Sequence, residues 1–311
     1  MKKRAFHLAV LIFTSLFLCM PAAAEFSQIV AFGDSLTDNG ISPAYGDYQA
    51  DYHGIDHFSN GDVWVEYLAQ SREIRLDDWA YGGAYTGYGT NFNDSEYGLL
   101  WQVSNYVDYF NSATAPFPMD SSALYTIWAG GNDFLDLPSN PSQGEIAATI
   151  GTATTNIVSA INQLAGAGAQ NFLVLNLPDL GKIPRYNYDP TVSGGATYLA
   201  DTFNQVLNNA LASYTVANPG INLCQLDSFA FLNDTINSGN FDNVTDPWWG
   251  SGENPNDYLF WNDIHPTTGA HWLLSEVADE QLNSCVPVPP SFLLLISGLA
   301  GLVGIKRKLA A

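Results

Sequence analysis

Short apolar runs alternate with longer amphipathic stretches through the middle of this chain, residues 25–285. Four apolar runs predict buried strands: residues 27–32, 123–129, 171–177 and 221–226. Helical spacing of apolar residues predicts helices at about residues 61–70, 98–111, 143–168 and 195–217, with one more after Pro266. This alternation predicts one α/β domain with a parallel sheet and helices on both faces.

Polar residues follow three of the predicted strands at the point where each strand ends. They are Ser35, Asn132 and Asp179. Ligands of such sheets bind beyond the carboxyl ends of the strands, so we expect a site at that edge. Residues 178–194 and 229–260 are rich in Gly, Pro, Asn and aromatic residues, which predicts loops over the same edge.

The two ends of the chain differ from its middle. Residues 1–24 have a basic start, an apolar stretch and three final alanines, which predicts a secretory signal cleaved after Ala24. Residues 286–311 have a proline-rich start, an apolar run and a basic end. The run is short for a transmembrane helix, and the basic end favours the cytoplasmic side. We therefore expect three parts: a signal, a domain over residues 25–285, and a C-terminal segment with a short transmembrane stretch.

The charge of the chain is lopsided. It has 10 Lys and Arg against 31 Asp and Glu, and six of the basic residues lie in the two ends. Residues 25–285 therefore hold four basic residues against 31 acidic ones, a formal charge of −27. Such a surface repels nucleic acid, so no nucleic-acid partner is expected. It suits an exported protein that must stay soluble, and it tolerates neutral or cationic substrates.

Of the three cysteines, Cys19 leaves with the signal, while Cys224 and Cys285 remain. An exported chain can join two cysteines in a disulfide. The sequence leaves open whether these two are close enough to pair.

Ser35 follows the first predicted strand in the stretch IVAFGDSLTDNG. A serine there is either a helix cap or a nucleophile, and a nucleophilic serine needs a base, usually histidine. His265 is the best candidate base, since it lies at the start of a helix with Asp263 two residues before it. His271 falls inside that helix and is expected to be a packing residue.

The other histidines contribute no expected chemistry. His7 leaves with the signal. His53 and His57 lie four residues apart beside acidic residues, but no helix is predicted there to aim them at one metal ion. We therefore expect no metal site.

Four blocks spread over residues 25–285 share one order: FGDSLTDNG with Ser35, WAYGGAYTG with Gly83, AGGNDF with Asn132 and FWNDIHPTTGAH with His265. Together they resemble the SGNH hydrolases, also called GDSL lipases/esterases. The resemblance implies a three-layer α/β/α fold with a flavodoxin-like parallel sheet. It also implies a hydrolase acting on ester bonds without a cofactor.

The resemblance assigns a role to each matched residue. Ser35 would attack the acyl carbon, and His265 would take its proton and later protonate the leaving alcohol. The amides of Ser35 and Gly83 and the side chain of Asn132 would form the oxyanion hole.

The last block departs from the family pattern, which has an Asp three residues before the His. That position is Asn262 here, and Asp263 lies one step closer. Two arrangements remain: Asp263 completes a triad with Ser35 and His265, or a Ser-His pair works with a backbone carbonyl orienting the ring. We favour the triad with Asp263.

The C-terminal segment, VPVPPSFLLLISGLAGLVGIKRK, resembles a PEP-CTERM sorting signal in its VPLPA-like variant, with Val288 in place of the usual acid. This resemblance implies an exosortase-type processing enzyme as a partner. It also implies export by the general secretory route of a Gram-negative bacterium and transient anchoring in the inner membrane. Release to the cell surface or the extracellular matrix would follow.

The leading functional prediction is a secreted serine esterase or lipase, a carboxylesterase or lysophospholipase-like enzyme acting on small-molecule or lipid esters. Residues 57–69, HFSNGDVWVEYLA, resemble a segment of the family's lipase and lysophospholipase branch. A carbohydrate O-deacetylase acting on exopolysaccharide is an alternative, which the aromatic stretch at residues 246–261 allows. A non-catalytic matrix protein is a third possibility, supported only by Asn262.

Overall fold

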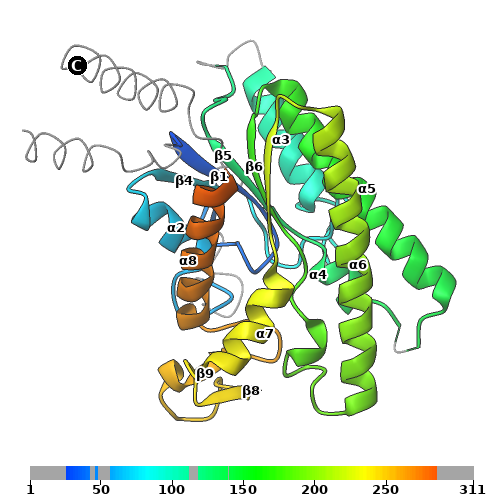
Figure 1. Cartoon of the computed structure of the whole chain (residues 1–311), viewed down its shortest axis with the longest axis vertical. Helices are drawn as coiled ribbons and strands as arrows, with labels where there is room; N and C mark the ends of the chain where they lie inside the picture. The colour runs from blue at the N-terminus through cyan, green and yellow to red at the C-terminus, as the bar shows by residue number, and fades with distance from the viewer. Residues whose placement is uncertain (1–25, 43–45, 48–56, 112–117, 139, 286–311) are drawn as a thin grey trace, which may run out of the picture. The chain divides into compact units, whose positions relative to one another are not determined.

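A parallel five-stranded sheet forms the centre of the unit that spans residues 26–282 (Figure 1). Its strands are β1 (Gln28–Gly33), β4 (Arg75–Asp78), β5 (Leu124–Trp128), β6 (Asn171–Leu175) and β7 (Asn222–Leu226). They lie in the order β4-β1-β5-β6-β7, and every neighbouring pair is parallel. Counted along the chain this is the flavodoxin-like order 2-1-3-4-5, as predicted.

Helices cover both faces of the sheet and complete three layers. Figure 1 shows α2 and α8 on one face and α3, α5 and α6 on the other. The helices are α2 (Trp64–Ser71), α3 (Leu99–Asn111), α4 (Gly131–Leu135), α5 (Gln143–Ala167), α6 (Pro190–Ala217), α7 (Ser228–Ser238) and α8 (Thr268–Cys285). Two short strand pairs lie outside the sheet: β2 (Ile41–Ser42) with β3 (Gly46–Asp47), and β8 (Asn243–Pro247) with β9 (Tyr258–Phe260).

This computed structural model describes residues 26–42, 46–47, 57–111, 118–138 and 140–285. The predicted signal (residues 1–24) and the predicted sorting signal (residues 286–311) lie outside the described residues. Among the helices that the structure describes, none is both long enough and apolar enough to cross a membrane. The transmembrane stretch expected within residues 286–311 lies outside this search, because these residues are not described.

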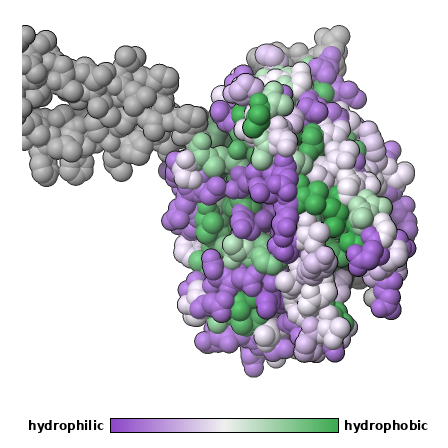
Figure 2. Space-filling model, turned by 45° about the vertical axis from the view of Figure 1, so that its right-hand side comes forward, coloured by the Kyte–Doolittle hydropathy of each residue, from purple (hydrophilic) through white to green (hydrophobic). Residues whose placement is uncertain are grey.

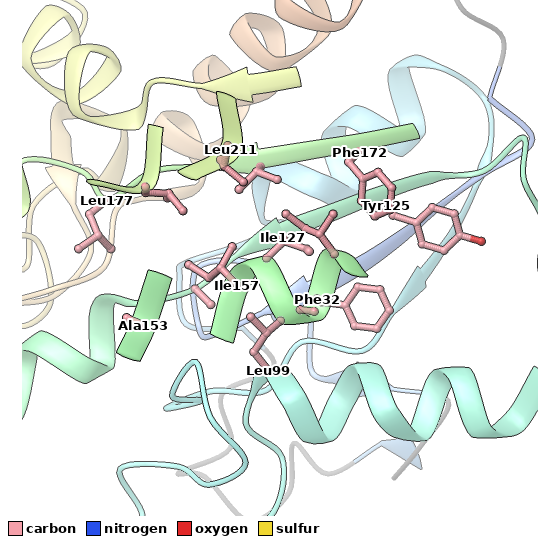
Figure 3. Packing of buried hydrophobic residues seen from close by; sticks show 14 of the residues in the cluster. Phe32, Leu99, Tyr125, Ile127, Ala153, Ile157, Phe172, Leu177 and Leu211 are labelled. Atoms are coloured by element: carbon pink, nitrogen blue, oxygen red, sulfur yellow. The ribbon is translucent and has the colours of Figure 1, made fainter. Parts of the chain in front are cut away.

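The main core lies between the sheet and the helices α3, α5 and α6. Figure 3 shows Phe32 and Ile127 of the sheet meeting Leu99 of α3 and Ile157 of α5. The buried positions of α5 recur every three or four residues from Ile150 to Leu164, so one stripe of that helix faces the core. The sheet edge that carries the site is therefore held by a fully packed scaffold.

The predicted strands of the sheet and the predicted helices are all present, with ends shifted by a few residues. The sequence pattern does not predict β4, because Arg75, Asp77 and Asp78 make this edge strand polar. The helix α7 is not predicted either, since it lies in a segment expected to be loop; Asp227 caps this helix by accepting the N–H of Ala230. Figure 2 shows hydrophilic residues interspersed with apolar ones on one face of the molecule.

Candidate active site

Ser35 lies directly after β1, in a tight turn at the carboxyl edge of the sheet. Gly33 makes this turn possible, since a Cβ there would lie 2.2 Å from the carbonyl oxygen of Trp128. The N–H groups of Thr37 and Asp38 donate to the carbonyl oxygen of Asp34 and close the turn. Ser35 is buried, and its Oγ lies 2.7 Å from Nε2 of His265. Its hydroxyl therefore meets a base and does not cap a helix.

His265 is held by a second tight turn, which Asn262 closes. The Asn262 Oδ1 accepts the backbone N–H groups of Ile264 at 2.9 Å and His265 at 2.7 Å, and it lies 3.1 Å from Nδ1 of His265. Because two N–H groups already point at Oδ1, this atom is an acceptor, and the ring must donate to it from Nδ1. Nε2 is then unprotonated and accepts a hydrogen bond from the Ser35 hydroxyl. This is the tautomer that a general base requires.

The His265 imidazole is neutral over most of the pH range. Burial lowers its pKa to about 4, with the carboxylate of Asp263 opposing this shift and the cation of Arg185 adding to it. A neutral ring can accept the serine proton at ordinary pH.

Asp263 does not contact the His265 ring, so the expectation that Asp263 completes the triad is wrong. Its Oδ2 lies 2.9 Å from Nε of Arg185, and its backbone carbonyl accepts the Arg185 N–H at 2.8 Å. About half of its side chain is exposed. In this turn the Asn262 side chain contacts the His265 ring, whereas the Asp263 side chain points toward Arg185 and solvent. The ring is thus oriented by a side-chain carbonyl, that of Asn262, and not by Asp263 or a backbone carbonyl.

Two of the three expected oxyanion-hole residues, Gly83 and Asn132, lie beside each other. Asn132 is at the start of α4, just after β5, and lines the same pocket as Ser35. Its Nδ2 donates to the carbonyl oxygen of Ala84 at 3.0 Å, and Ala84 directly follows Gly83. Gly83 has a left-handed backbone with φ of 77°, which favours glycine. The structure thus places Ser35 and Asn132 around one pocket, with His265 hydrogen-bonded to Ser35 and the Gly83 loop hydrogen-bonded to Asn132.

Buried carboxylates hold the loops around this site. Asp38 accepts the N–H groups of Gly40 and Gly82, and Asp78 accepts those of Asn39 and Ala80. Burial raises the pKa of Asp38 to about 7 and places that of Asp78 well above its ordinary value. The sequence carries no signal for these two residues, because an acidic residue in a loop usually indicates an exposed surface.

A small apolar pocket of about 60 Å³ opens beside Ser35. Ser35 and Asn132 are among its polar lining residues. Its apolar wall includes Leu135, Leu177, Leu180, Ile183, Leu232 and Phe260. Such a pocket can take the first carbons of a hydrocarbon chain attached to the carbonyl that Ser35 would attack.

Two stacked tryptophans form an aromatic platform near His265. Trp249 stacks on Trp261 with 4.9 Å between ring centroids and an interplanar angle of 22°. The Trp261 ring lies 6.2 Å from that of His265. Trp249 is 54% exposed, so its ring faces solvent near the site.

The remaining histidines have structural contacts. His271 is buried and accepts the N–H of Trp64 through Nδ1, which confirms it as a packing residue. His57 forms an ion pair with Glu66 at 2.9 Å, and Asp62 brings a third possible ligand atom within 4.8 Å of theirs. This cluster contains none of the site residues. His53 lies outside the described residues.

A family model described as GDSL-like Lipase/Acylhydrolase matches residues 29–277. The chain is 29% identical to a thermolabile hemolysin of Vibrio parahaemolyticus, with 84% of this chain aligned. It spans only 65% of the hemolysin's length. It is 29% identical to a phosphatidylcholine-sterol acyltransferase of Aeromonas hydrophila, over 83% of this chain and 91% of that protein. An acetylesterase of Thermothelomyces thermophilus is 25% identical, over 71% of this chain and 75% of its own length.

Proposed function

The chain belongs to the GDSL-like lipase/acylhydrolase family and is an ester-hydrolysing enzyme, and we propose that it cleaves esters whose acyl chain is apolar and longer than acetyl, through an acyl-enzyme on Ser35. The proposal rests on the apolar pocket, which Ser35 and Asn132 help to line. An acetyl ester would place only one methyl group in this pocket. The leucine and isoleucine side chains beyond it would bind methylene groups.

The proposed mechanism uses the Ser35–His265 pair with Asn262 as its orienting residue. Nε2 of His265 accepts the hydroxyl proton while Oγ of Ser35 attacks the acyl carbon. The amides of Ser35 and Gly83 and the side chain of Asn132 stabilise the oxyanion. The imidazolium then protonates the leaving alcohol. A water molecule, activated by the same nitrogen, releases the acid from the acyl-enzyme.

A substitution that narrows the pocket tests the assignment of the acyl chain. Ala270 lies on α8, is buried and lines the pocket. We expect Ala270→Leu to lower kcat/KM for a p-nitrophenyl octanoate about tenfold and to change that for the acetate less than about twofold, because the larger side chain displaces only a longer acyl group. Hydrolysis rates across a C2–C12 ester series provide the measurement.

Ala278→Leu is the matched control, since Ala278 is a buried alanine of the same helix that does not line the pocket. It reports the effect of overpacking alone. Equal losses of kcat/KM for the octanoate and the acetate in the Ala270→Leu variant would contradict the assignment of this pocket to the acyl chain.

A carbohydrate O-deacetylase is the second candidate function, and the Trp249–Trp261 platform favours it. Flat aromatic faces supply rigid apolar contact area, against which the sugar part of an acetylated carbohydrate could pack. If the alcohol is a sugar, Trp249→Ala should slow acetate release from an acetylated exopolysaccharide about tenfold and leave a small p-nitrophenyl ester unaffected. Absence of acetate release by the parent enzyme would eliminate this candidate.

Export and C-terminal processing are supported by the residue patterns at the two ends. With an exosortase system present, we expect the released protein to begin at Glu25 and to lack residues 286–311, and the intermediate to be anchored transiently in the inner membrane. Intact-mass spectrometry of the released protein measures both ends. A released form that still carries Ala311 would contradict the processing step.

A further inference from the structure

Asn91 contacts both proposed side-chain and loop components of the oxyanion hole. Its backbone N–H donates to the carbonyl oxygen of Gly83 at 2.9 Å. Its side-chain Nδ2 donates to Oδ1 of Asn132 at 3.1 Å. Asn91 also packs directly on Gly83, because a Cβ built there would lie 2.2 Å from Oδ1 of Asn91. One residue therefore links the two elements, although they come from distant parts of the chain.

The carboxamide of Asn132 can act in the oxyanion hole only if its nitrogen faces the reacting oxygen. The two ends of a carboxamide have nearly the same shape, so packing alone does not choose between them. Here both ends have partners: Oδ1 accepts from Asn91, and Nδ2 donates one hydrogen to Ala84. The second hydrogen on Nδ2 remains for the oxyanion. With the amide reversed, an oxygen would face the developing negative charge and repel it.

We propose that Asn91 is a positioning residue of the oxyanion hole: it fixes the Asn132 amide with its nitrogen toward the reacting oxygen and holds the peptide that follows Gly83. This inference rests on the proposed function, in which Asn132 and Gly83 bind the oxyanion.

The hydrogen bonding of Asn91 argues against a purely structural role. Among the described residues no donor reaches its Oδ1, although that atom is buried. A buried amide oxygen without a partner costs stability, so an apolar side chain would fill this position at a lower cost. The side-chain hydrogen bond that Asn91 does make goes to Asn132.

Asn91→Ala is expected to lower kcat about 10- to 100-fold with KM changed less than about threefold, because the transition state loses an oriented donor while substrate binding is kept. Asn156→Ala is the matched control. The Asn156 Nδ2 donates to Oγ1 of Thr86 at 3.2 Å in the same region but does not reach Asn132. Its kcat should stay within about twofold of the parent's.

Asn91→Asp separates positioning from space filling. At neutral pH the new carboxylate can only accept hydrogen bonds, so it would draw Nδ2 of Asn132 toward itself and turn the amide around. We expect a loss larger than that of Asn91→Ala. At a pH low enough to protonate the new carboxyl, this group donates to Oδ1 of Asn132 and partly restores kcat relative to the parent at the same pH.

A double-mutant cycle tests whether the effect passes through Asn132. In an Asn132→Ala background, Asn91→Ala should lower kcat by less than about threefold, since no amide is left to orient. A similar loss in both backgrounds would overturn the proposal, as would a kcat above one third of the parent's for Asn91→Ala alone.

Nuclear magnetic resonance provides a readout that does not need activity. The assigned side-chain amide protons of Asn132 should exchange slowly in the parent enzyme and much faster in Asn91→Ala. Unchanged exchange would overturn the proposal. If the parent hydrolysed no ester, the proposed function would fail, while the exchange measurement would still decide whether Asn91 orients Asn132.

Discussion

Ser35→Ala is expected to reduce ester hydrolysis by about 10⁴-fold or more. The substitution removes the nucleophile, and the oxyanion hole and substrate binding alone leave a small residual rate. The fold should survive, because the variant loses one hydroxyl and its hydrogen bond to His265. Steady-state hydrolysis of a p-nitrophenyl ester measures the loss, and circular dichroism and the melting temperature check the fold.

Ser59→Ala is a suitable control for that experiment. Ser59 is also buried, and its Oγ donates to the carbonyl oxygen of Pro266, the residue after His265. Its loss removes a comparable hydrogen bond near the site without removing the proposed nucleophile. Ser35→Ala with more than one tenth of the parent's activity would rule out Ser35 as the nucleophile.

Asn262→Asp is expected to raise kcat at least about tenfold. A carboxylate at this position can accept the same N–H groups as the amide oxygen does, so the turn and the His265 tautomer are kept. The added negative charge stabilises the imidazolium that forms when the ring takes the Ser35 proton. Asn262→Leu has the opposite effect, a loss of about a hundredfold or more, because Nδ1 then has no acceptor to fix the tautomer.

The pH profile provides an independent readout of the Asn262 substitution. The parent should lose kcat/KM only as the pH falls through about 4, the pKa of His265, because the protonated ring cannot accept the serine proton. A carboxylate beside the ring favours its charged form, so the acid limb of Asn262→Asp should move to higher pH.

Asp263→Asn is the control for the Asn262 series and should change kcat less than about threefold, since Asp263 pairs with Arg185. A hundredfold loss in Asp263→Asn, with no effect of Asn262→Asp, would show that Asp263 and not Asn262 serves the ring.

The α/β class with a parallel sheet was predictable from the sequence because the strands that form the sheet interior are continuous apolar runs, whereas the flavodoxin-like arrangement followed from the family resemblance. β1, β5 and β6 are buried along nearly their whole length, which is typical of parallel strands covered on both sides. β4 lies at the edge and is largely polar, so its pattern carries little signal. The helix α7 escaped prediction because its sequence lies in a segment rich in loop-forming residues.

The candidate site was only partly predictable, for a geometric reason. Ser35, Asn132 and His265 stand in specific motifs, but spacing alone does not decide whether the residue two or three positions before His265 meets its ring. The local turn decides that, and the turn depends on hydrogen bonds from Ile264 and His265 to Asn262. Asn91 had no sequence signal either, since its contact with Asn132 exists only after the two loops meet.

Covalent labelling identifies the nucleophile directly. A p-nitrophenyl alkylphosphonate, which reacts as an ester substrate but forms a stable adduct, is incubated with the enzyme, and the labelled peptide is mapped by mass spectrometry. The account predicts one adduct, on Ser35, accompanied by stoichiometric loss of hydrolysis and absent from Ser35→Ala. An adduct on another residue, or undiminished hydrolysis with Ser35 fully labelled, would contradict it.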